Sequence, residues 1–248
     1  MSLDNLPVFS VDEETAFPLL KATLPPGSAI TTEPGAMVDH SGTVELKGSA
    51  KGGAKKAMSR AFLSSEGLFQ TTASNPPTGR PDAFIRMAPA TPGTIILMNL
   101  TEGNPEAVDS PNPVFSEIFL SDGAFLASHE TVKIGVQRQS LSKGLFSSAG
   151  FFVMRATGAG TLAINCYGSY RRIDLADGEE HVVDNGHVVA WTASYTTSKA
   201  SKGWFSTAKT GEGVVFRFTG PGCVYITSRN IGELALSLIP FLPTPSNN

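Results

Sequence analysis

Cysteine is scarce in this chain, and long apolar runs are absent. The 248 residues include two cysteines, Cys166 and Cys223, which are too few for a disulfide framework or for a zinc site built from cysteine. We expect both thiols to be buried as small apolar side chains. The longest strongly apolar run near a terminus, residues 234–242, has nine residues, whereas a membrane-spanning helix needs about 20.

A strong net charge and a targeting signal are also missing. The net charge is −3, so the chain as a whole has no general attraction to nucleic acid or to a membrane. The N-terminal residues 1–17 have no positively charged segment followed by an apolar one, and they contain four acids and no arginine. We therefore expect neither a secretory signal peptide nor a cleavable mitochondrial presequence.

Common catalytic motifs do not occur either. The chain has no G-x-S-x-G elbow of a serine hydrolase and no G-x-x-x-x-G-K-[ST] phosphate-binding loop. It also lacks the His-x-His pair that a cupin-type metal enzyme would need. We therefore expect no catalytic residues and no cofactor.

One group of potential metal ligands remains among the four histidines. His181, Asp184 and His187 lie within seven residues of one another. The Asn185-Gly186 turn between them should break the strand and point the two imidazoles apart, so we expect a polar set beside a turn and no metal site. A metal-dependent β-barrel enzyme that uses these three side chains is the alternative.

Glycine is plentiful, and it is placed at intervals that repeat. An L-x-x-G pattern recurs at a spacing of about 75 residues, with its leucines at Leu24, Leu100 and Leu175. A second glycine follows in each copy, and so do two further glycine landmarks. Four shared landmarks in three copies indicate an internal triplication, with repeats at about 24–99, 100–174 and 175–230.

The glycines are followed by stretches in which side chains alternate in character. In VVFRF, residues 214–218, the first, third and fifth residues face one way and the others face the opposite way. Residues 161–166 and 223–227 alternate likewise. A phosphate-binding glycine loop needs a helix directly after it. We therefore interpret these glycines as turns between short strands.

These patterns predict an all-β fold. We expect one domain over residues 17–242, built as a pseudo-threefold sandwich- or barrel-like body. Residues 1–16 should be a flexible N-terminal tail and residues 243–248 a C-terminal tail, and the single helix should span about 231–239. Repeats of this size leave apolar faces and strand edges bare, so the three copies should pack together and cover them.

One charge pattern rises above this background. Each predicted repeat contains one loop that is basic and free of acids, and the three loops hold ten of the 19 lysines and arginines. Pseudosymmetry would bring them to one end of the molecule, as a surface for an anionic membrane or a membrane-protein partner. The candidate residues are Lys51, Lys55, Lys56, Arg60, Arg138, Lys143, Lys199, Lys202 and Trp204.

The loops also allow a simpler explanation. Their cations can be solubilising loop tips, while the neighbouring aromatic residues return to the core. Nucleic acid is a less favoured partner, because the aromatic residues do not interleave with the cations as they do in a base-stacking platform. The oligomeric state is left open.

Two segments carry a resemblance to a known family: VVDNGHVVAW at residues 182–191 and GPGCVYITSRN at residues 220–230. With the order of the other landmarks, they resemble the altered-inheritance-of-mitochondria family (the Aim twenty-four type) over about 17–242. The resemblance implies a β-sandwich similar to the tryptophan RNA-binding attenuator-like superfamily and no established catalytic residues. For fungal members it implies a role in mitochondrial biogenesis and inner-membrane organisation.

The functional expectation combines this resemblance with the basic loops. We expect a non-enzymatic structural or scaffold protein that contacts an anionic membrane, or a membrane-bound partner, through those loops. The resemblance implies mitochondrial residence, and the cytoplasm is the alternative because no presequence is visible. RNA binding by analogy with the attenuator-like fold is the weakest alternative.

Overall fold

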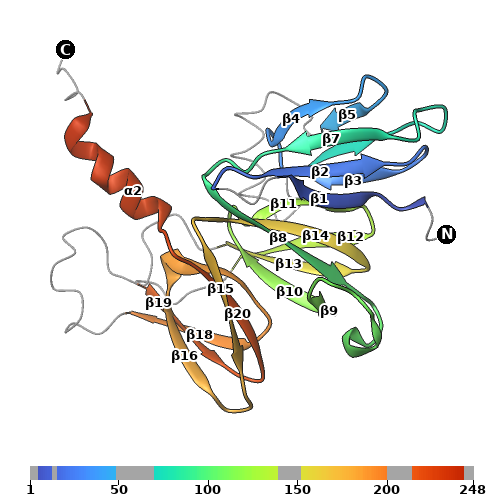
Figure 1. Ribbon diagram of the computed structural model, residues 1–248. Helices are drawn as coiled ribbons and strands as arrows, with labels where there is room; N and C mark the ends of the chain where they lie inside the picture. Colours follow the sequence, from blue (N-terminus) through green and yellow to red (C-terminus); the bar gives the residue numbers. More distant parts are fainter. Residues whose placement is uncertain (1–4, 13–15, 49–69, 139–151, 200–213, 243–248) are drawn as a thin grey trace.

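The computed structural model describes residues 5–12, 16–48, 70–138, 152–199 and 214–242. These residues form an all-β body with one short α-helix near the C-terminus, as the sequence predicts (Figure 1). The strands are arranged in four sheets, here called sheets A, B, C and D. Short 3-10 turns complete the described elements: η2 (Pro105–Ala107), η3 (Asn185–His187) and η4 (Ile239–Phe241).

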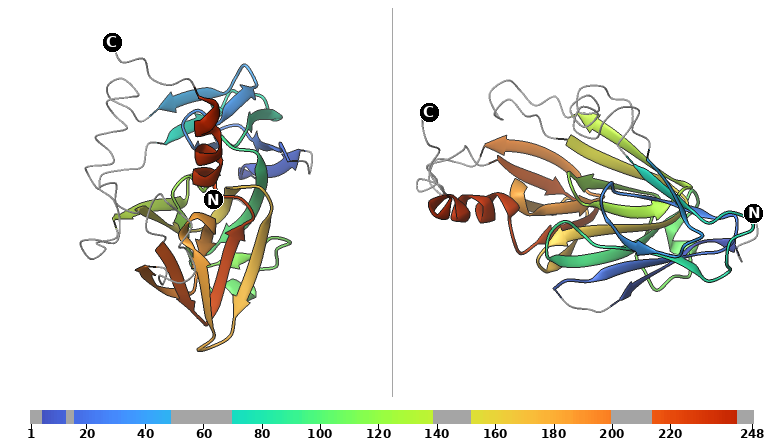
Figure 2. Two further views of the ribbon diagram at one scale, coloured as in Figure 1. Left: turned by 90° about the vertical axis from the view of Figure 1, so that its left-hand side faces the viewer. Right: turned by 90° about the horizontal axis from the view of Figure 1, so that it is seen from above.

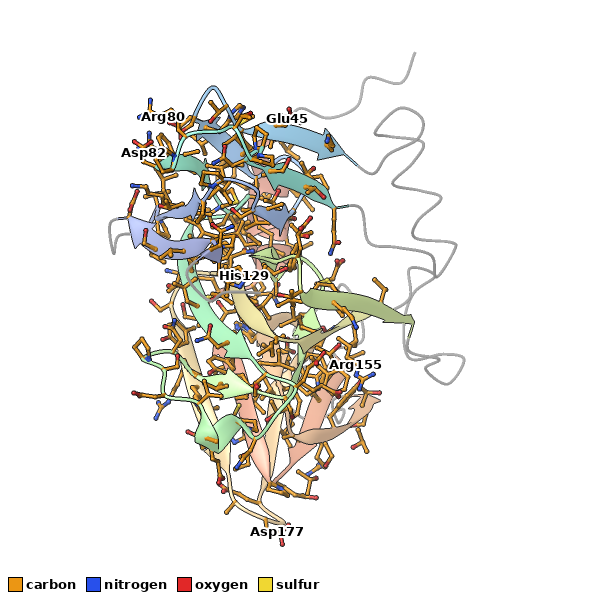
Figure 3. All side chains as sticks on the ribbon, turned by 90° about the vertical axis from the view of Figure 1, so that its right-hand side faces the viewer. Glu45, Arg80, Asp82, His129, Arg155 and Asp177 are labelled. Carbon is orange, nitrogen blue, oxygen red and sulfur yellow. The ribbon has the colours of Figure 1, made fainter. Side chains whose placement is uncertain are left out.

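The two smaller sheets lie at opposite ends of the molecule (Figure 3). Sheet A has the strand order β1 (Val8–Asp12), β2 (Leu19–Leu24), β7 (Ala83–Met87) and β4 (Met37–His40). Sheet D has the order β16 (Glu180–Asp184), β19 (Val214–Thr219) and β18 (Ser194–Lys199).

The two larger sheets lie between them. Sheet B has the order β5 (Glu45–Gly48), β6 (Thr71–Ser74), β3 (Ala29–Thr32), β11 (Phe125–His129), β14 (Gly160–Tyr167), β8 (Gly93–Leu100) and β9 (Val114–Phe115). Sheet C has the order β12 (Val132–Arg138), β13 (Phe152–Gly158), β10 (Glu117–Ser121), β17 (Val188–Trp191), β20 (Gly222–Thr227) and β15 (Tyr170–Leu175).

The same pairing pattern occurs in three successive six-strand units. The units are β2–β7, β8 with β10–β14, and β15–β20. In each unit the first strand pairs with the sixth and the second with the fifth. The third strand also pairs with the sixth, and the fourth with the fifth. Leu24, Leu100 and Leu175 end the first strands, so each unit starts one strand before the predicted repeat boundary.

Neighbouring units are joined by one kind of junction, in which the second strand of one unit pairs with the third strand of the next. This junction joins β3 to β11 and β10 to β17. A third junction, between β16 and β4, would close a ring, but each of these strands lies at the edge of its sheet. The described units therefore form an open stack, and the pseudo-threefold body predicted from the sequence is not confirmed. The outer face of sheet A is charged, and burying these charges in a closed ring would cost free energy, which explains why the stack is open.

Three apolar cores lie between the four sheets. The core between sheets A and B contains Leu20, Ile85 and Ile30, and the core between sheets B and C contains Met98 and Ile118. Aromatic rings dominate the core between sheets C and D, where Trp191, Phe216 and Phe218 are fully buried. Sheets B and C are covered on both faces, so β11 and most of β14 are buried without alternation.

The third strand of every unit contains a shift in register. The shifts follow Met37, Phe125 and Val188, and they displace Val38, Leu126 and Val189 from regular pairing. Glycines precede two of these strands: Gly35 and Gly123 have φ values of 87° and 75°. Residues with a Cβ resist this left-handed backbone, so the prediction that these glycines turn the chain is confirmed.

The N-terminal segment departs from the prediction. Residues 8–12, expected within a flexible tail, form β1 and pair with β2 along its whole length. Phe9 and Val11 pack against the core between sheets A and B. The strand is ordered because it covers the edge of β2 and adds apolar contacts, both of which depend on residues distant in sequence.

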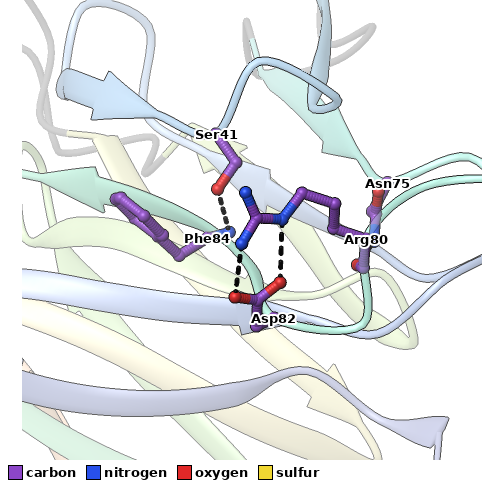
Figure 4. A network of polar contacts seen from close by, with 5 residues as sticks. All are labelled: Ser41, Asn75, Arg80, Asp82 and Phe84. Atoms are coloured by element: carbon purple, nitrogen blue, oxygen red, sulfur yellow. Dashed lines mark hydrogen bonds and ion pairs between the residues drawn. The ribbon is translucent and has the colours of Figure 1, made fainter.

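Residues 75–82, an insert between β6 and β7, fold onto the first unit. Asn75 donates from Nδ2 to the carbonyl oxygens of Leu24 and Arg80, at 2.8 and 2.7 Å. Arg80 then forms a two-pronged ion pair with Asp82 at the surface (Figure 4). These bonds bring the insert back to the start of β7.

The predicted helix is present as α2 (Ile231–Leu238), and η4 follows it. The side chain of Asn230 caps α2 by accepting hydrogen bonds from the N–H groups of Gly232 and Glu233. Figure 1 shows α2 leaving the end of β20 and extending away from the sheets.

Candidate functional site

The three basic loops follow equivalent strands. Residues 49–69 connect β5 to β6, residues 139–151 connect β12 to β13, and residues 200–213 connect β18 to β19. Each is the connection between the fourth and fifth strands of its unit, and each flanking pair is antiparallel. Seven predicted residues lie in these connections, outside the described residues: Lys51, Lys55, Lys56, Arg60, Lys143, Lys202 and Trp204.

The strands that lead into these connections point to one side of the molecule. Figure 2 (left) shows β5, β12 and β18 running toward the same side. Arg138 is the last residue of β12 and is opposite Phe152, while Lys199 ends β18 opposite Val214. The structure thus places two predicted residues at the roots of their connections. A role in contacting an anionic partner stays a prediction for all nine residues.

The three potential metal ligands have separate local roles. The Asp184 carboxylate accepts a hydrogen bond from the Gly186 N–H at 2.9 Å and caps η3. Nδ1 of His187 lies 2.8 Å from the carbonyl oxygen of Thr227, and it carries the proton because a carbonyl only accepts. His181 lies in β16 opposite Phe218. Within the described part of the chain, no three His, Cys, Asp or Glu side chains are grouped to hold a metal ion.

The two cysteines are unreactive core residues. Both are free and buried, as the sequence predicts, and both belong to the core between sheets B and C. Burial raises the pKa of the Cys166 thiol and of the Cys223 thiol. A raised pKa lowers the thiolate fraction at neutral pH, and the thiolate is the nucleophile.

An acidic pair near the junction of the first two units was not predicted. Glu33 follows β3, and its N–H donates to the carbonyl oxygen of Leu126 at 2.8 Å. Burial, and to a smaller extent the charge of Asp122, together raise the pKa of the Glu33 carboxyl to about 7. Glu33 and Asp122 occupy neighbouring positions of equivalent turns, so the repeat itself contained a signal for this pair.

His129 connects the N-terminal segment to the second unit. Its Nδ1 accepts the N–H of Thr161 at 3.1 Å, so Nε2 carries the proton and donates to the carbonyl oxygen of Pro7 at 2.8 Å. Burial lowers the pKa of the imidazole. This neutral histidine serves as a structural link between Pro7, next to β1, and sheet B.

An arginine packs between two aromatic rings where sheets B and C approach each other. The guanidinium carbon of Arg172 lies 5.8 Å from the ring centre of Phe115 and 6.0 Å from that of Tyr225. Arg172 also pairs with Asp174 at 2.7 Å. Burial raises the pKa of Tyr225 to about 12, against the opposing effect of the Arg172 charge. These contacts support packing at the sheet edges.

Exposed apolar side chains are concentrated at the C-terminal end. Of the 15 large apolar residues that are exposed in the described ranges, seven lie within 231–242: Ile231, Leu234, Leu236, Leu238, Ile239, Phe241 and Leu242. The sequence indicated an apolar run here but gave no measure of its exposure. No helix in the described ranges is both long and apolar enough to cross a membrane.

Comparisons with known proteins place the chain among bacterial relatives. A family model described as "Mitochondrial biogenesis AIM24" matches residues 9–229. The chain is 35% identical over 253 residues to an uncharacterized protein of Streptococcus pyogenes serotype M6, covering 99% of this chain and 95% of the relative. It is also similar to the crystal structure of a Streptococcus pyogenes protein, with a TM-score of 0.73 and 33% identity. That alignment covers 95% of this chain and all of the solved chain.

Proposed function

The chain belongs to the AIM24 family of mitochondrial-biogenesis proteins, and on that premise we propose that it is a non-enzymatic scaffold that contacts an anionic membrane, or a membrane-bound partner, through its three basic connections. One observation carries the proposal. The basic segments connect the same pair of strands in every unit, and the strands leading into them run to one side. Cations gathered on one side attract anionic lipid even when the net charge of the chain is negative.

Three described polar side chains that could have served in catalysis have structural roles, which supports the non-enzymatic proposal. Asp184 caps a 3-10 turn, His187 is bonded to a strand carbonyl, and His129 is a buried neutral link. Each is engaged in holding the fold. A general acid or base needs a side chain free to exchange a proton with a bound substrate.

The proposed partner is an anionic membrane rather than one organelle. The family is described by its part in mitochondrial biogenesis, whereas the two relatives above come from a bacterium. Anionic lipid is common to both settings. Mitochondrial residence of this chain is a separate proposal, and locating a C-terminally tagged copy in cells tests it against the cytoplasm.

Vesicle flotation tests the membrane contact. The full chain should float with vesicles that contain cardiolipin, and high salt should weaken this binding because salt screens exposed charges. Replacing Lys51, Lys55, Lys56, Lys143 and Lys202 with Glu should abolish it.

A matched pair of variants separates position from total charge. Lys143→Glu/Lys202→Glu changes two cations in the basic connections, whereas Lys21→Glu/Lys133→Glu makes the same charge change on β2 and β12. The first variant should bind the vesicles more weakly than the second. Equal loss in both would leave only a general charge effect and would refute the role of the connections.

A further inference from the structure

Residues 231–242 form an apolar helical segment without a buried side. Every residue from Ile231 to Leu242 is exposed, and Phe241 reaches 84%. Glu233 is the one charged residue of the segment. A helix on the surface of a globular protein normally turns one apolar stripe to the core and a polar face to water. This segment turns no side to a core, although Glu233 and Ser237 form a narrow polar strip one turn apart.

The base of the helix is nonetheless firmly attached. The side chain of Asn230 caps the first turn. A Cβ at Gly186 would lie 2.0 Å from Nδ2 of Asn230, so η3 packs closely against the capping residue. Figures 1 and 2 show α2 directed away from the sheets. The helix is thus presented outward from a fixed base, and its sides are open to a partner.

The residues around this base suit a lipid headgroup region. Tyr170 is 44% exposed and pairs with Thr227, four residues before the helix. Arg171 and Arg229 are also exposed, and neither forms an ion pair within the described ranges. Tyrosine is enriched at membrane interfaces, and arginine is attracted to anionic headgroups.

The distribution of apolar residues favours a bilayer over a protein groove. Leu234 and Leu238 lie on one side of the helix, and Leu236 lies on another side. A groove in a partner covers one side and leaves the rest in water, whereas acyl chains surround an inserted helix. The 12 residues would span about 18 Å as a helix, less than the hydrocarbon thickness of about 30 Å.

We propose that residues 231–242 insert into one leaflet of a lipid bilayer, with Tyr170, Arg171 and Arg229 at the level of the headgroups. This anchor is separate from the basic connections and goes beyond the function proposed above. Because insertion removes apolar surface from water, it does not require anionic lipid and it resists salt.

Flotation with pure phosphatidylcholine vesicles at high salt tests the anchor. The full chain should float under these conditions, and Leu234→Glu/Leu238→Glu should reduce the bound fraction at least about tenfold, because each buried leucine contributes more than one tenfold step. The matched control is Val8→Glu/Val182→Glu, which adds the same charge at exposed valines of β1 and β16. The control should bind like the wild type.

A second measurement does not depend on a disruptive variant. Leu236→Cys places one exposed thiol on the helix, since both native cysteines are buried. A polarity-sensitive fluorophore on this thiol should shift to shorter wavelength when phosphatidylcholine vesicles are added. An unchanged spectrum would overturn the proposal.

The outcomes distinguish this proposal from its rivals and from the proposed function. If the wild-type chain is an oligomer without lipid, and Leu234→Glu/Leu238→Glu converts it to a monomer without changing vesicle binding, the helix contacts a second copy of the chain. That result would overturn insertion. If only the lysine variants lose vesicle binding, and the binding that they lose is sensitive to salt, the result supports the basic connections and counts against the anchor. If only the helix variant loses vesicle binding, and the binding that it loses is resistant to salt, the result supports the anchor and counts against the basic connections.

Discussion

Burial shifts the pKa of Glu33 and of His129 toward the neutral form of each side chain. The carboxyl of Glu33 has a pKa of about 7, and the imidazole of His129 has a lowered pKa. The two shifts have opposite consequences for stability. His129 favours the folded state at a pH above its unfolded value and loses that contribution as the pH falls, whereas Glu33 favours it at low pH.

Replacing Glu33 by Gln should stabilise the protein at pH 8. The folded-state pKa of Glu33 is raised from 4.5 to about 7, so its favourable contribution is complete below pH 4.5 and is lost as the pH rises to 7. At pH 8 the variant no longer buries a carboxylate near Asp122. We expect a gain of about 1 kcal/mol after allowing for solvent screening, or about 3 °C in melting temperature.

The pH dependence supplies the control. At pH 4 Glu33 is mostly protonated in both the folded and the unfolded states, so wild type and variant should melt nearly alike. Thermal unfolding followed by circular dichroism at both pH values measures the difference. A stabilisation of equal size at pH 4 would show that packing, rather than the charge, is responsible.

At the scale of single elements, equivalent strands differ in what covers them. Val38, Leu126 and Val189 are the displaced residues of the third strands in the three units. Leu126 and Val189 are buried, whereas Val38 is 54% exposed. The difference follows from position in the stack, since Leu126 enters the core of the first unit, whereas Val38 lies on a strand at the edge of sheet A.

Truncating the displaced residue should therefore lower the stability of the protein by different amounts in the first and the second unit. Leu126→Ala should destabilise the protein by about 2–5 kcal/mol, because it removes buried apolar contacts and leaves a cavity. Val38→Ala, at the equivalent exposed position, should change stability by less than about 0.5 kcal/mol. Urea unfolding of both variants tests the assignment, and similar losses at the two positions would contradict it.

At the scale of the whole molecule, one charged pair marks the end of the stack. Asp39 and Arg86 pair across β4 and β7 and form an ion pair on the outer face of sheet A. Ala127 and Ala163 are the corresponding pair in the second unit, where both are buried against the first. The charges therefore act as a cap, as polar outer faces do in terminal repeats of other stacked proteins.

Removing the cap should allow copies of the chain to associate. In Asp39→Ala/Arg86→Ala the outer face of sheet A resembles the second unit, and the free edges of β4 and β16 can form the missing junction between two molecules. Light scattering after gel filtration should show mass that rises with protein concentration. The control is Arg80→Ala/Asp82→Ala, which removes an exposed ion pair of the insert before β7 and should leave the mass unchanged.

Local sequence determined the features that depend on neighbouring residues alone. Alternation in residues 214–218 indicated a strand, Gly35 and Gly123 indicated turns, and residues 231–239 indicated the helix. A period of two or a positive φ is a property of a few consecutive residues, so it can be read without knowing the fold.

Tertiary structure decided which of several similar sequence segments is buried and which is exposed. Val38 and Leu126 have similar surroundings in sequence and opposite exposure, and β1 is ordered only through its pairing with β2. The open stack and the pKa of Glu33 likewise depend on contacts between different units. Pairing between distant strands sets burial, and burial sets the cost of charge and the gain from apolar contact.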